Sequence, residues 1–375
     1  MKLGIAAIFK NEFEFIIEWV CYHRLLGVDK FYIADNVSDD GSSELLQILD
    51  YLGYIKRIHF PRVNNIPPQA PAYNFILKEY GNEVDLLAFI DADEFIVCDG
   101  LINENKIIND FYRNETLSAM GINWKIYGSS NKKLPSLGLV TKDFVYRSEK
   151  TDLNCNHIKS LIKPNKVSQV FIHDCLLSTG VYCNTSLEVD IFPDGASNYP
   201  KTNQVSYDNL HINHYVIKSR IDQFVKKMNK GSAAGSAKRK KGVAYFQAHD
   251  KNDVYDPFSS DFIEKLILEV NNLRKEIDNS YHFMPLCNGH VDVNFNNNTI
   301  SGWISDINLD LVRITINEKE YIAKLDKMRN DVYSRGLSNG ERCGFSLNII
   351  LKSDDIVDAY IYSSSLPLNK NVIEK

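Results

Sequence analysis

Short apolar runs alternate with amphipathic stretches along the N-terminal third of the chain. Leu3–Phe9 is almost wholly apolar, which is typical of a strand buried on both faces. Apolar residues then recur at helical spacing from Phe15 to Leu26, and Gly27 is a natural end for that helix. The same alternation predicts strands at Lys30–Ala34, Ile55–Phe60 and Leu86–Ile90 and helices at Glu44–Leu52 and Tyr73–Tyr80. Strands and helices that alternate over short connections predict an α/β fold, with a mostly parallel sheet flanked by helices.

The middle of the chain has a less regular pattern. It predicts helices near 104–113, 218–229 and 262–277 and strands near 118–124, 139–146, 158–163 and 168–173. Residues 231–242 are small and then basic, which is typical of a mobile loop.

From about Pro285 the pattern changes to short alternating runs separated by Asn, Asp, Gly and Ser. The predicted strands are Ile300–Ile304, Leu311–Ile316, Tyr321–Lys324, Phe345–Ile350 and Ile356–Tyr362. Runs of this kind predict a small all-β sandwich. We therefore expect two domains, residues 1–284 and residues 285–375.

Charge and cysteine content narrow the class of protein. The 375 residues include 43 basic and 48 acidic side chains, a net charge of −5, whereas nucleic-acid binders usually carry a basic excess. The seven cysteines are irregularly spaced, which fits reduced thiols better than a disulfide framework. No run reaches the roughly 20 apolar residues of a membrane-spanning helix. We expect a cytoplasmic protein that binds no nucleic acid and is at most peripheral at the inner face of the membrane.

Polar side chains follow three of the predicted strands at the point where each strand ends. These pairs are Asn11 and Glu12, Asp35 and Asn36, and Asp91 and Asp93. In open α/β sheets, ligands bind beyond the carboxyl ends of the strands. The three pairs are therefore expected to line one binding site.

The acidic motif Asp91-Ala92-Asp93-Glu94 carries the strongest chemical signal. Two carboxylates on a turn just past a buried strand can hold Mn²⁺ or Mg²⁺, which stabilises a departing diphosphate. An EF-hand is excluded because its sixth position needs Gly and is Ile96 here. A haloacid dehalogenase-like phosphatase, a nucleotidyltransferase or a solvated turn remain alternatives. The phosphatase motif usually ends the first strand, however, and a nucleotidyltransferase would normally show a Gly-rich loop after that strand.

Several segments together resemble the family 2-like glycosyltransferases close to glycosyltransferase family 92. The N-terminal ones are Lys10-Asn11-Glu12, Glu18-Trp19-Val20, Tyr22-His23, Gly27-Val28-Asp29, Phe31-Tyr32-Ile33, Asp35-Asn36 and Ile90-Asp91-Ala92-Asp93-Glu94-Phe95. Two later ones are Trp124-Lys125-Ile126-Tyr127-Gly128-Ser129 and His214-Tyr215-Val216-Ile217-Lys218-Ser219. The resemblance covers about residues 1–260. It implies a GT-A fold, a nucleotide-sugar donor, most often UDP-linked, and a divalent metal. By analogy, Asn11, Glu12, Asp35 and Asn36 would line the nucleoside pocket, together with Asp91.

Each of the remaining candidate site residues could instead have a purely structural role. His214 could complete the metal site with Asp91 and Asp93, or be a core histidine at a strand end. Lys218 and the run Lys238–Lys241 could bind phosphate oxygens, or be ordinary solvated lysines. Trp124 could stack on an acceptor sugar, or pack in the core. Trp19 and His23 lie on the helix face that we expect to be buried.

An inverting enzyme also needs a base to deprotonate the acceptor hydroxyl. Asp174 and Glu149 are the first candidates, and Asp143 and Asp194 are possible too. The sequence does not choose among them.

These features predict a metal-dependent glycosyltransferase that moves a sugar to a hydroxyl of a glycan or a lipid-linked glycan. Gly302-Trp303-Ile304, Arg329-Asn330-Asp331-Val332 and Gly344-Phe345 are similar to small β-domains appended to bacterial glycan-assembly transferases. Bacterial surface polysaccharide assembly is the setting that this similarity implies. A non-catalytic glycan-binding protein is the remaining alternative, and the intact acidic motif weakens it.

Overall fold

The computed structural model describes residues 1–38, 40–63, 66–136, 138–222, 242–281, 289–305, 311–317, 319–335, 337–338, 340–361 and 368–373. Its contacts divide the chain into two compact units, Met1–Ile277 and Asp278–Lys375, and each is described by itself. Within the described residues, no helix is both long enough and apolar enough to cross a membrane.

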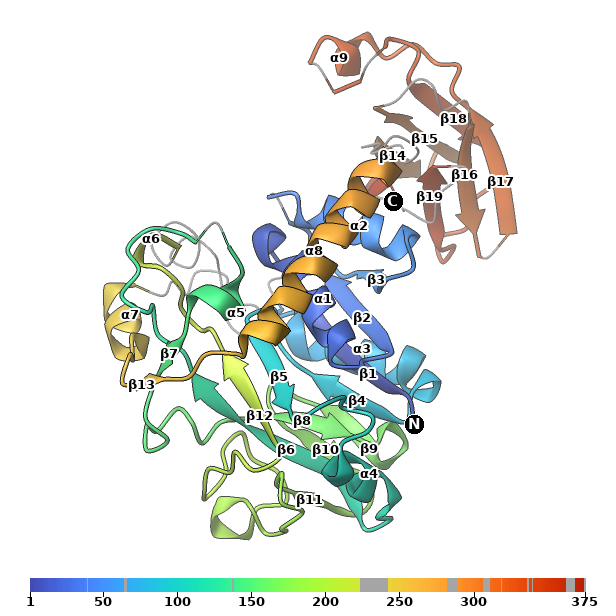
Figure 1. Cartoon of the computed structure of the whole chain (residues 1–375). Helices are drawn as coiled ribbons and strands as arrows, with labels where there is room; N and C mark the ends of the chain where they lie inside the picture. Colours follow the sequence, from blue (N-terminus) through green and yellow to red (C-terminus); the bar gives the residue numbers. More distant parts are fainter. Residues whose placement is uncertain are drawn as a thin grey trace. The chain divides into compact units, whose positions relative to one another are not determined.

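Half of the main sheet in the first unit is parallel. Its strands follow the order β3-β2-β1-β4, with β1 at Leu3–Phe9, β2 at Lys30–Asp35, β3 at Lys56–His59 and β4 at Leu86–Phe89. The connecting helices are α1 at Phe13–Leu25, α2 at Ser42–Tyr51 and α3 at Gln69–Tyr80. This is the alternation that the apolar runs predict (Figure 1).

The other half of the sheet is mixed. The order continues β8-β6-β12-β5, with β5 at Glu94–Cys98, β6 at Leu117–Ile126, β8 at Ile158–Ile162 and β12 at Leu210–His214. Strand β8 runs antiparallel to both β4 and β6, and β12 runs parallel to β6, so β4, β6 and β12 all end at the same edge. The short strand β11 (Val181–Cys183) also pairs with β6.

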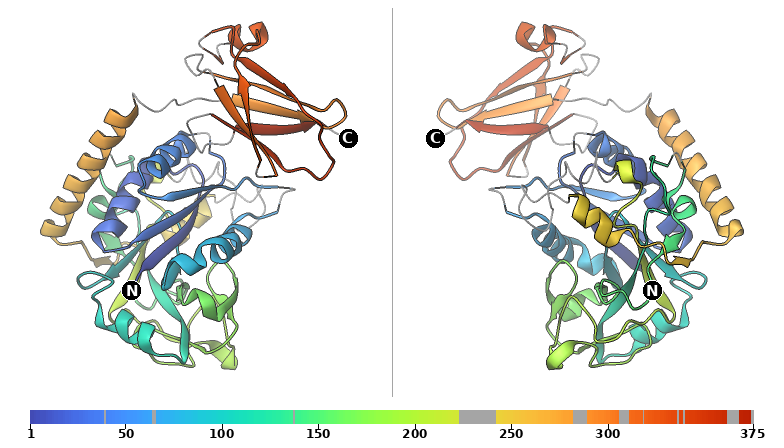
Figure 2. Two further views of the ribbon diagram at one scale, coloured as in Figure 1. Left: turned by 90° about the vertical axis from the view of Figure 1, so that its right-hand side faces the viewer. Right: turned by 90° about the vertical axis from the view of Figure 1, so that its left-hand side faces the viewer.

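Helices cover the two faces of this sheet unequally. Alternate residues of β1 point to opposite sides, so that Ile5 and Phe9 join one hydrophobic cluster and Ala6 joins the other. The first cluster contains residues of α1, α2, α4 (Lys106–Arg113) and α8 (Ser260–Tyr281), and the second contains residues of α3. Figure 2 shows α8 on the side of the sheet that α1 and α2 cover.

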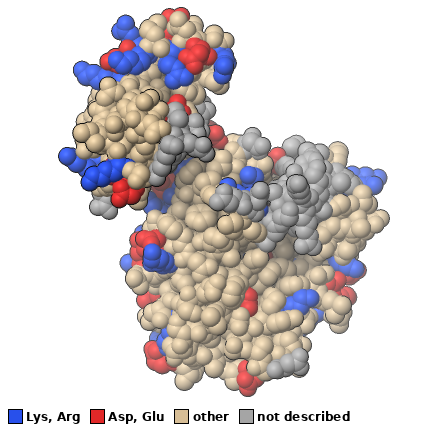
Figure 3. All heavy atoms as spheres, turned by 180° about the vertical axis from the view of Figure 1, so that it is seen from behind, with Lys and Arg blue, Asp and Glu red and all other residues tan. Residues whose placement is uncertain are grey.

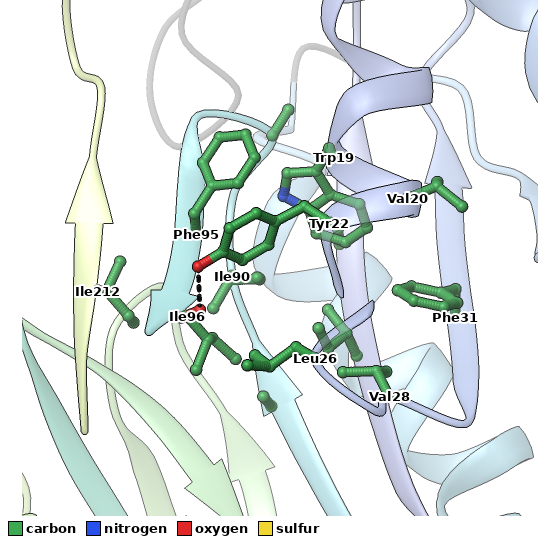
Figure 4. Packing of buried hydrophobic residues seen from close by; sticks show 14 of the residues in the cluster. Trp19, Val20, Tyr22, Leu26, Val28, Phe31, Ile90, Phe95, Ile96 and Ile212 are labelled. Carbon is green, nitrogen blue, oxygen red and sulfur yellow. Dashed lines mark hydrogen bonds between the residues drawn. The ribbon is translucent and has the colours of Figure 1, made fainter. Parts of the chain in front are cut away.

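The buried face of α1 packs against β5 as its helical spacing predicts (Figure 4). The hydroxyl of Tyr22 donates to the carbonyl of Ile96 at 2.8 Å. His23 is fully buried, its Nε2 accepts from the backbone N–H of Ile96 at 3.2 Å, and its Nδ1 lies 2.9 Å from the carbonyl of Trp19. Only the neutral imidazole with its proton on Nδ1 satisfies both contacts. Trp19 and His23 are therefore core residues.

The neutral state of His23 makes its contribution to stability depend on pH. Burial lowers the pKa of His23 to about 3, so on acidification the unfolded chain takes up a proton near pH 6.5 while the folded chain does not. The stability that His23 confers is complete above pH 6.5 and is lost as the pH falls towards 3. We expect the difference in unfolding free energy between wild type and His23→Gln to shrink by about 2 kcal/mol between pH 7 and pH 5. Urea unfolding at both pH values measures it, because the other charges cancel in the difference. A constant difference would contradict a buried neutral His23.

One predicted strand is wrong. The expected strand at 139–146 is replaced by the short helix α5 at Val140–Asp143, followed by β7 at Tyr146–Arg147. The buried carboxylate of Glu18 accepts hydrogen bonds from the N–H groups of Val140 and Thr141 at 2.7 and 2.9 Å, which holds the first turn of α5.

The long helix predicted at 218–229 is described only as α6 at Arg220–Asp222, and Lys238–Lys241 lie outside the described residues.

The remaining elements of the first unit are short, apart from α8. They are β9 at Val167–Val170, β10 at Cys175–Leu177, α7 at Val243–His249 and β13 at Val254–Tyr255.

On the face drawn in Figure 3, acidic and basic side chains of the described residues are interspersed. A charged ligand on that face would therefore be attracted by a few neighbouring side chains.

The second unit is built from two small sheets. One has the order β18-β15-β14-β20 and the other β17-β16-β19. Their bounds are β14 Gly289–Asn294, β15 Thr299–Ile304, β16 Leu311–Ile316, β17 Lys319–Lys324, β18 Gly344–Asn348, β19 Val357–Ile361 and β20 Asn369–Ile373, with α9 at Asn330–Tyr333. Alternate residues of β14, β15 and β16 are buried in one shared core, as the alternating pattern predicts.

Candidate active site

The acidic motif lies between the end of β4 and the start of β5. Strand β12 pairs with β5 so that His214 faces Glu94, and the backbone N–H of Tyr215 donates to the carbonyl of Asp93 at 2.8 Å. This pairing places His214 Nε2 3.5 Å from Asp93 Oδ1, with side chains that are 8 and 14% exposed. The structure thus brings together two predicted metal ligands that lie far apart in the sequence.

Asp91 is held by three donors. Its Oδ1 accepts from the Tyr73 hydroxyl at 3.0 Å and from the Gln69 amide at 2.6 Å. Its Oδ2 accepts from Lys159 Nζ at 2.9 Å. Both carboxylate oxygens of Asp91 are therefore engaged by side chains of the protein.

Lys159 is the main member of the site that we did not predict. Its side chain is 1% exposed, and its ammonium lies 2.9 Å from Asp91 and 3.7 Å from the buried carboxylate of Glu94. It also donates to the carbonyl of Ile172 at 3.1 Å. The available signal was a lysine in the interior of the strand predicted at 158–163, since a lysine is almost never fully buried without a partner.

The charges of this cluster are strongly coupled. Burial would lower the pKa of Lys159, but Asp91 and Glu94 outweigh it and raise that pKa. The surrounding protein would raise the pKa of Asp91, but Lys159 outweighs it and lowers that pKa. Burial raises the pKa of Glu94 well above its usual range. The ionised pair is therefore Lys159 with Asp91, and Glu94 favours its protonated form.

Trp124 lies among three histidine rings and is 8% exposed. Its ring stacks on His157 with centroids 5.0 Å apart, and it packs against His214 at 4.3 Å and His173 at 5.3 Å. Burial lowers the pKa of His157 and lowers that of His173 to about 3, so both rings favour the neutral form. Trp124 thus supports His214 from the side of β6, and an acceptor could reach only a small part of it.

The nucleoside candidates lie in two loops at the ends of β1 and β2. The backbone N–H of Asn11 donates to the Ser38 hydroxyl at 3.0 Å, and that of Glu12 donates to the Ser42 hydroxyl at 2.8 Å. Asn11 adopts a φ of 54°, a left-handed conformation that Asn tolerates better than most residues. The two loops are therefore fixed to each other.

Asp35 and Asn36 have different environments within these loops. Asp35 is buried and bound by Arg57, with 2.7 Å between Nη2 and Oδ2, and by the Ser43 hydroxyl at 2.8 Å. Asn36 is 2% exposed, and its side-chain oxygen has no hydrogen-bond donor among the described residues. A buried acceptor without a donor costs free energy, which a ligand N–H or O–H could recover.

The other predicted residues lie elsewhere around the site. Lys218 Nζ lies 4.0 Å from the ring of Phe15 on α1, where its charge also acts on Glu18. Asp174 is buried beside His173, accepts from Asn198 at 2.8 Å, and has a pKa that burial raises. Glu149 is exposed.

The structure adds nothing in favour of the other two candidates for the general base, Asp143 and Asp194. Asp143 is bound by the Ser136 hydroxyl and lies 3.6 Å from Lys132. The side chain of Asp194 is outside the described part of the chain.

The donor set fits a divalent cation that takes most of its ligands from a substrate. Among the described residues, no three His, Cys, Asp or Glu side chains form a preformed metal site. Asp93 and His214 offer one oxygen and one nitrogen, and two ligands of one small divalent ion typically lie about 3 to 3.5 Å apart. Sites completed by phosphate oxygens need only one or two protein carboxylates.

Comparison with known proteins gives the family. A sequence model of glycosyltransferase family 92 matches residues 5–235. A family 92 protein of Oryza sativa subsp. japonica is 23% identical over 284 residues, which is 72% of this chain and 45% of that protein. One of Arabidopsis thaliana is 25% identical over 183 residues, 46% of this chain and 30% of that protein. The chain thus spans less than half the length of these relatives.

A solved structure overlaps part of the chain. Staphylococcus aureus TarS 1–349 in complex with UDP-GlcNAc is 12% identical, with a TM-score of 0.29 over 44% of this chain and 46% of that one. This overlap is too weak to support an assignment. The family match alone extends over more than half of the chain and shows that the chain belongs to glycosyltransferase family 92.

Proposed function

We propose that this protein transfers a sugar from a nucleoside diphosphate sugar to a hydroxyl of a glycan acceptor, with the help of a divalent metal. The observation that carries the proposal is the Asp93–His214 pair, 3.5 Å apart at the edge where β4 and β12 end. That edge is where open α/β sheets bind ligands. Family membership favours a transferase over a phosphatase, a nucleotidyltransferase or a non-catalytic binding protein.

The protein residues have distinct proposed roles around the leaving group. Asp93 and His214 would hold Mn²⁺ or Mg²⁺, which when bound stabilises the negative charge of the departing diphosphate. Asp91 is kept ionised and oriented by Lys159, so that it can accept hydrogen bonds from the ribose or from bound water. We assign it this role in preference to direct metal binding.

The nucleoside would occupy the loops after β1 and β2. The buried oxygen of Asn36 offers an acceptor to a base N–H or a ribose hydroxyl. Asn11 and Glu12 would flank it, and Asp35 would fix the loop through Arg57. A UDP-linked donor is proposed from the resemblance of these loops to those of the family.

The acceptor would approach from the side of Trp124 and His173. Asp174, next to His173, is our preferred base because a carboxylate with a raised pKa takes a proton more readily near neutral pH. Glu149 remains the second candidate. Assembly of a bacterial surface polysaccharide, on a glycan or lipid-linked glycan, is the proposed setting.

Donor hydrolysis tests the proposal without knowledge of the acceptor. We expect the protein with Mn²⁺ to release a nucleoside diphosphate slowly from at least one member of a panel of UDP-sugars and GDP-sugars, and EDTA to stop that release. Detection of the free diphosphate identifies the donor. Release of nucleoside monophosphate or inorganic phosphate instead would point to a phosphatase or pyrophosphatase.

A further inference from the structure

A cavity of about 310 Å³ lies in the first unit beyond the end of β6. Nine residues line it: Ser129, Asn131, Lys132, Lys133, Arg220, Val243, Phe246, Gln247 and Asp250. None of them belongs to the acidic motif or to the nucleoside loops. The cavity is therefore distinct from the candidate metal and nucleoside sites, and a group bound in it would be a different part of a ligand.

The wall of this cavity is basic in a chain that is acidic as a whole. Among the described residues that line the cavity, Lys132, Lys133 and Arg220 are basic and Asp250 is acidic, whereas the whole chain has a net charge of −5. Asp250 Oδ1 already accepts from the backbone N–H of Ser129 and from the Asn252 amide, each at 2.8 Å. Lys132 is partly offset by Asp143, 3.6 Å away. Lys133 is exposed and adds a positive charge that Asp250 does not offset by direct contact.

The loop that carries these lysines is held in a defined shape. Ser130 and Asn131 have φ angles of 50° and 59°, a left-handed pair that costs free energy unless neighbours impose it. The N–H of Ser130 donates to Asn252 at 2.7 Å, and its hydroxyl accepts from Val145 at 2.8 Å. A Cβ added at Gly128 would lie 2.1 Å from the carbonyl of Lys251, so the loop and residues 250–252 fit closely.

Arg220 is tied to the same loop through the backbone. Its N–H donates to the carbonyl of Lys132 at 3.2 Å, and the N–H of Ile221 donates to that of Lys133 at 3.1 Å. Two chain segments far apart in the sequence therefore present their cations together. Such preorganised cations suit carboxylate or phosphate oxygens.

Part of the cavity lining is apolar. Val243 and Phe246 of α7 line it beside the amide of Gln247. An apolar surface in the same cavity as a group of cations suits a sugar ring that carries an anionic substituent, because the ring has apolar faces of its own.

The cavity lies near the edge of the sheet that carries the metal candidates. The N–H of Tyr127, just before the loop, donates to the carbonyl of His214 at 3.0 Å, and Arg220 follows His214 by six residues in the chain. We propose that this cavity is an acceptor subsite that binds a carboxylate or phosphate group on a sugar of the glycan. This inference rests on the proposed transferase function and names the chemical class of its acceptor.

Titration calorimetry with glucuronate, glucose 1-phosphate and glucose tests the proposal in the presence of UDP and Mn²⁺. We expect one of the two anionic sugars, or both, to bind, and neutral glucose to bind at least about tenfold more weakly. Binding of glucuronate alone would assign the site to acidic sugars, and binding of glucose 1-phosphate alone to phosphorylated ones. Equal binding of glucose, or no binding of either anion, would overturn the proposal.

Two variants locate the binding. The double variant Lys132→Gln/Lys133→Gln should weaken binding of the anionic sugar by roughly tenfold or more. The single variant Lys133→Gln should weaken it less. Lys106→Gln on α4 is the control and should leave the binding unchanged. UDP binding should stay the same in all three. Loss of UDP binding in the lysine variants would assign the cavity to the diphosphate of the donor and overturn the acceptor role. Absence of UDP binding in wild type would instead count against the transferase proposal itself.

Discussion

Replacement of Lys159 by Met is expected to lower the free energy of unfolding by about 3 to 5 kcal/mol, because it leaves the carboxylate of Asp91 without its buried cation. Met has nearly the same length as the apolar part of Lys, so the loss comes from charge. Urea unfolding at pH 7 measures it.

Two controls separate the charge effect from a packing defect. Lys166→Met removes the pair with Glu115, whose side chain is 84% exposed while that of Lys166 is 12% exposed, and should cost much less than Lys159→Met because water screens the exposed carboxylate. Addition of Asp91→Asn to Lys159→Met removes the uncompensated carboxylate and should restore part of the stability. A Lys159→Met protein as stable as wild type would contradict the proposed ion cluster.

Asp93→Asn is expected to slow diphosphate release from the donor by about 100-fold or more, because it removes the charged oxygen ligand but keeps the shape of the side chain. We expect little change in stability, since Asn fills the same space as Asp at this side chain, which is 14% exposed. Steady-state release with saturating Mn²⁺ measures the effect.

Asp99→Asn is the matched control, since Asp99 is an exposed carboxylate just past the other end of β5 and should leave the rate unchanged. If Asp93→Asn kept the wild-type rate and its Mn²⁺ dependence, Asp93 could not be the metal ligand.

The first half of the fold could be predicted because its signals are local. Apolar runs such as Leu3–Phe9 become strands of the parallel half of the sheet, and the helical spacing after Asn11 places Trp19 and His23 in the core. The predicted α/β fold, a mostly parallel sheet flanked by helices with small β-sheets at the C-terminus, was confirmed, and β8 and β5 are the antiparallel strands that the main sheet adds among the described residues. The family resemblance was confirmed as well.

The parts that could not be predicted depend on partners distant in the sequence. Helix α5 is held by Glu18, 122 residues away, so a local pattern at 139–146 could not distinguish it from a strand. The role of Lys159 depends on Asp91, 68 residues away. His157, just before β8, and His173, between β9 and β10, join Trp124 only because these segments lie beside β6.

The roles of individual site residues stay predictions. Asp93 and His214 lie together as a metal pair requires, whereas Asp91 is engaged by Lys159, Tyr73 and Gln69. Which of the two aspartates a buried lysine engages depends on side-chain geometry. Two aspartates separated by one residue give no sign of it in the sequence.

Titration calorimetry of UDP and GDP into the protein, with Mn²⁺ and then with EDTA, tests the central claim most directly. The proposed site predicts that one nucleoside diphosphate, expected to be UDP, binds with Mn²⁺ and that EDTA or Asp93→Asn abolishes the binding. Tight binding of GDP alone would keep the site and change the donor. Absence of metal-dependent binding of either nucleotide would contradict the account of Asp93 and His214 as the metal-binding pair of a glycosyltransferase.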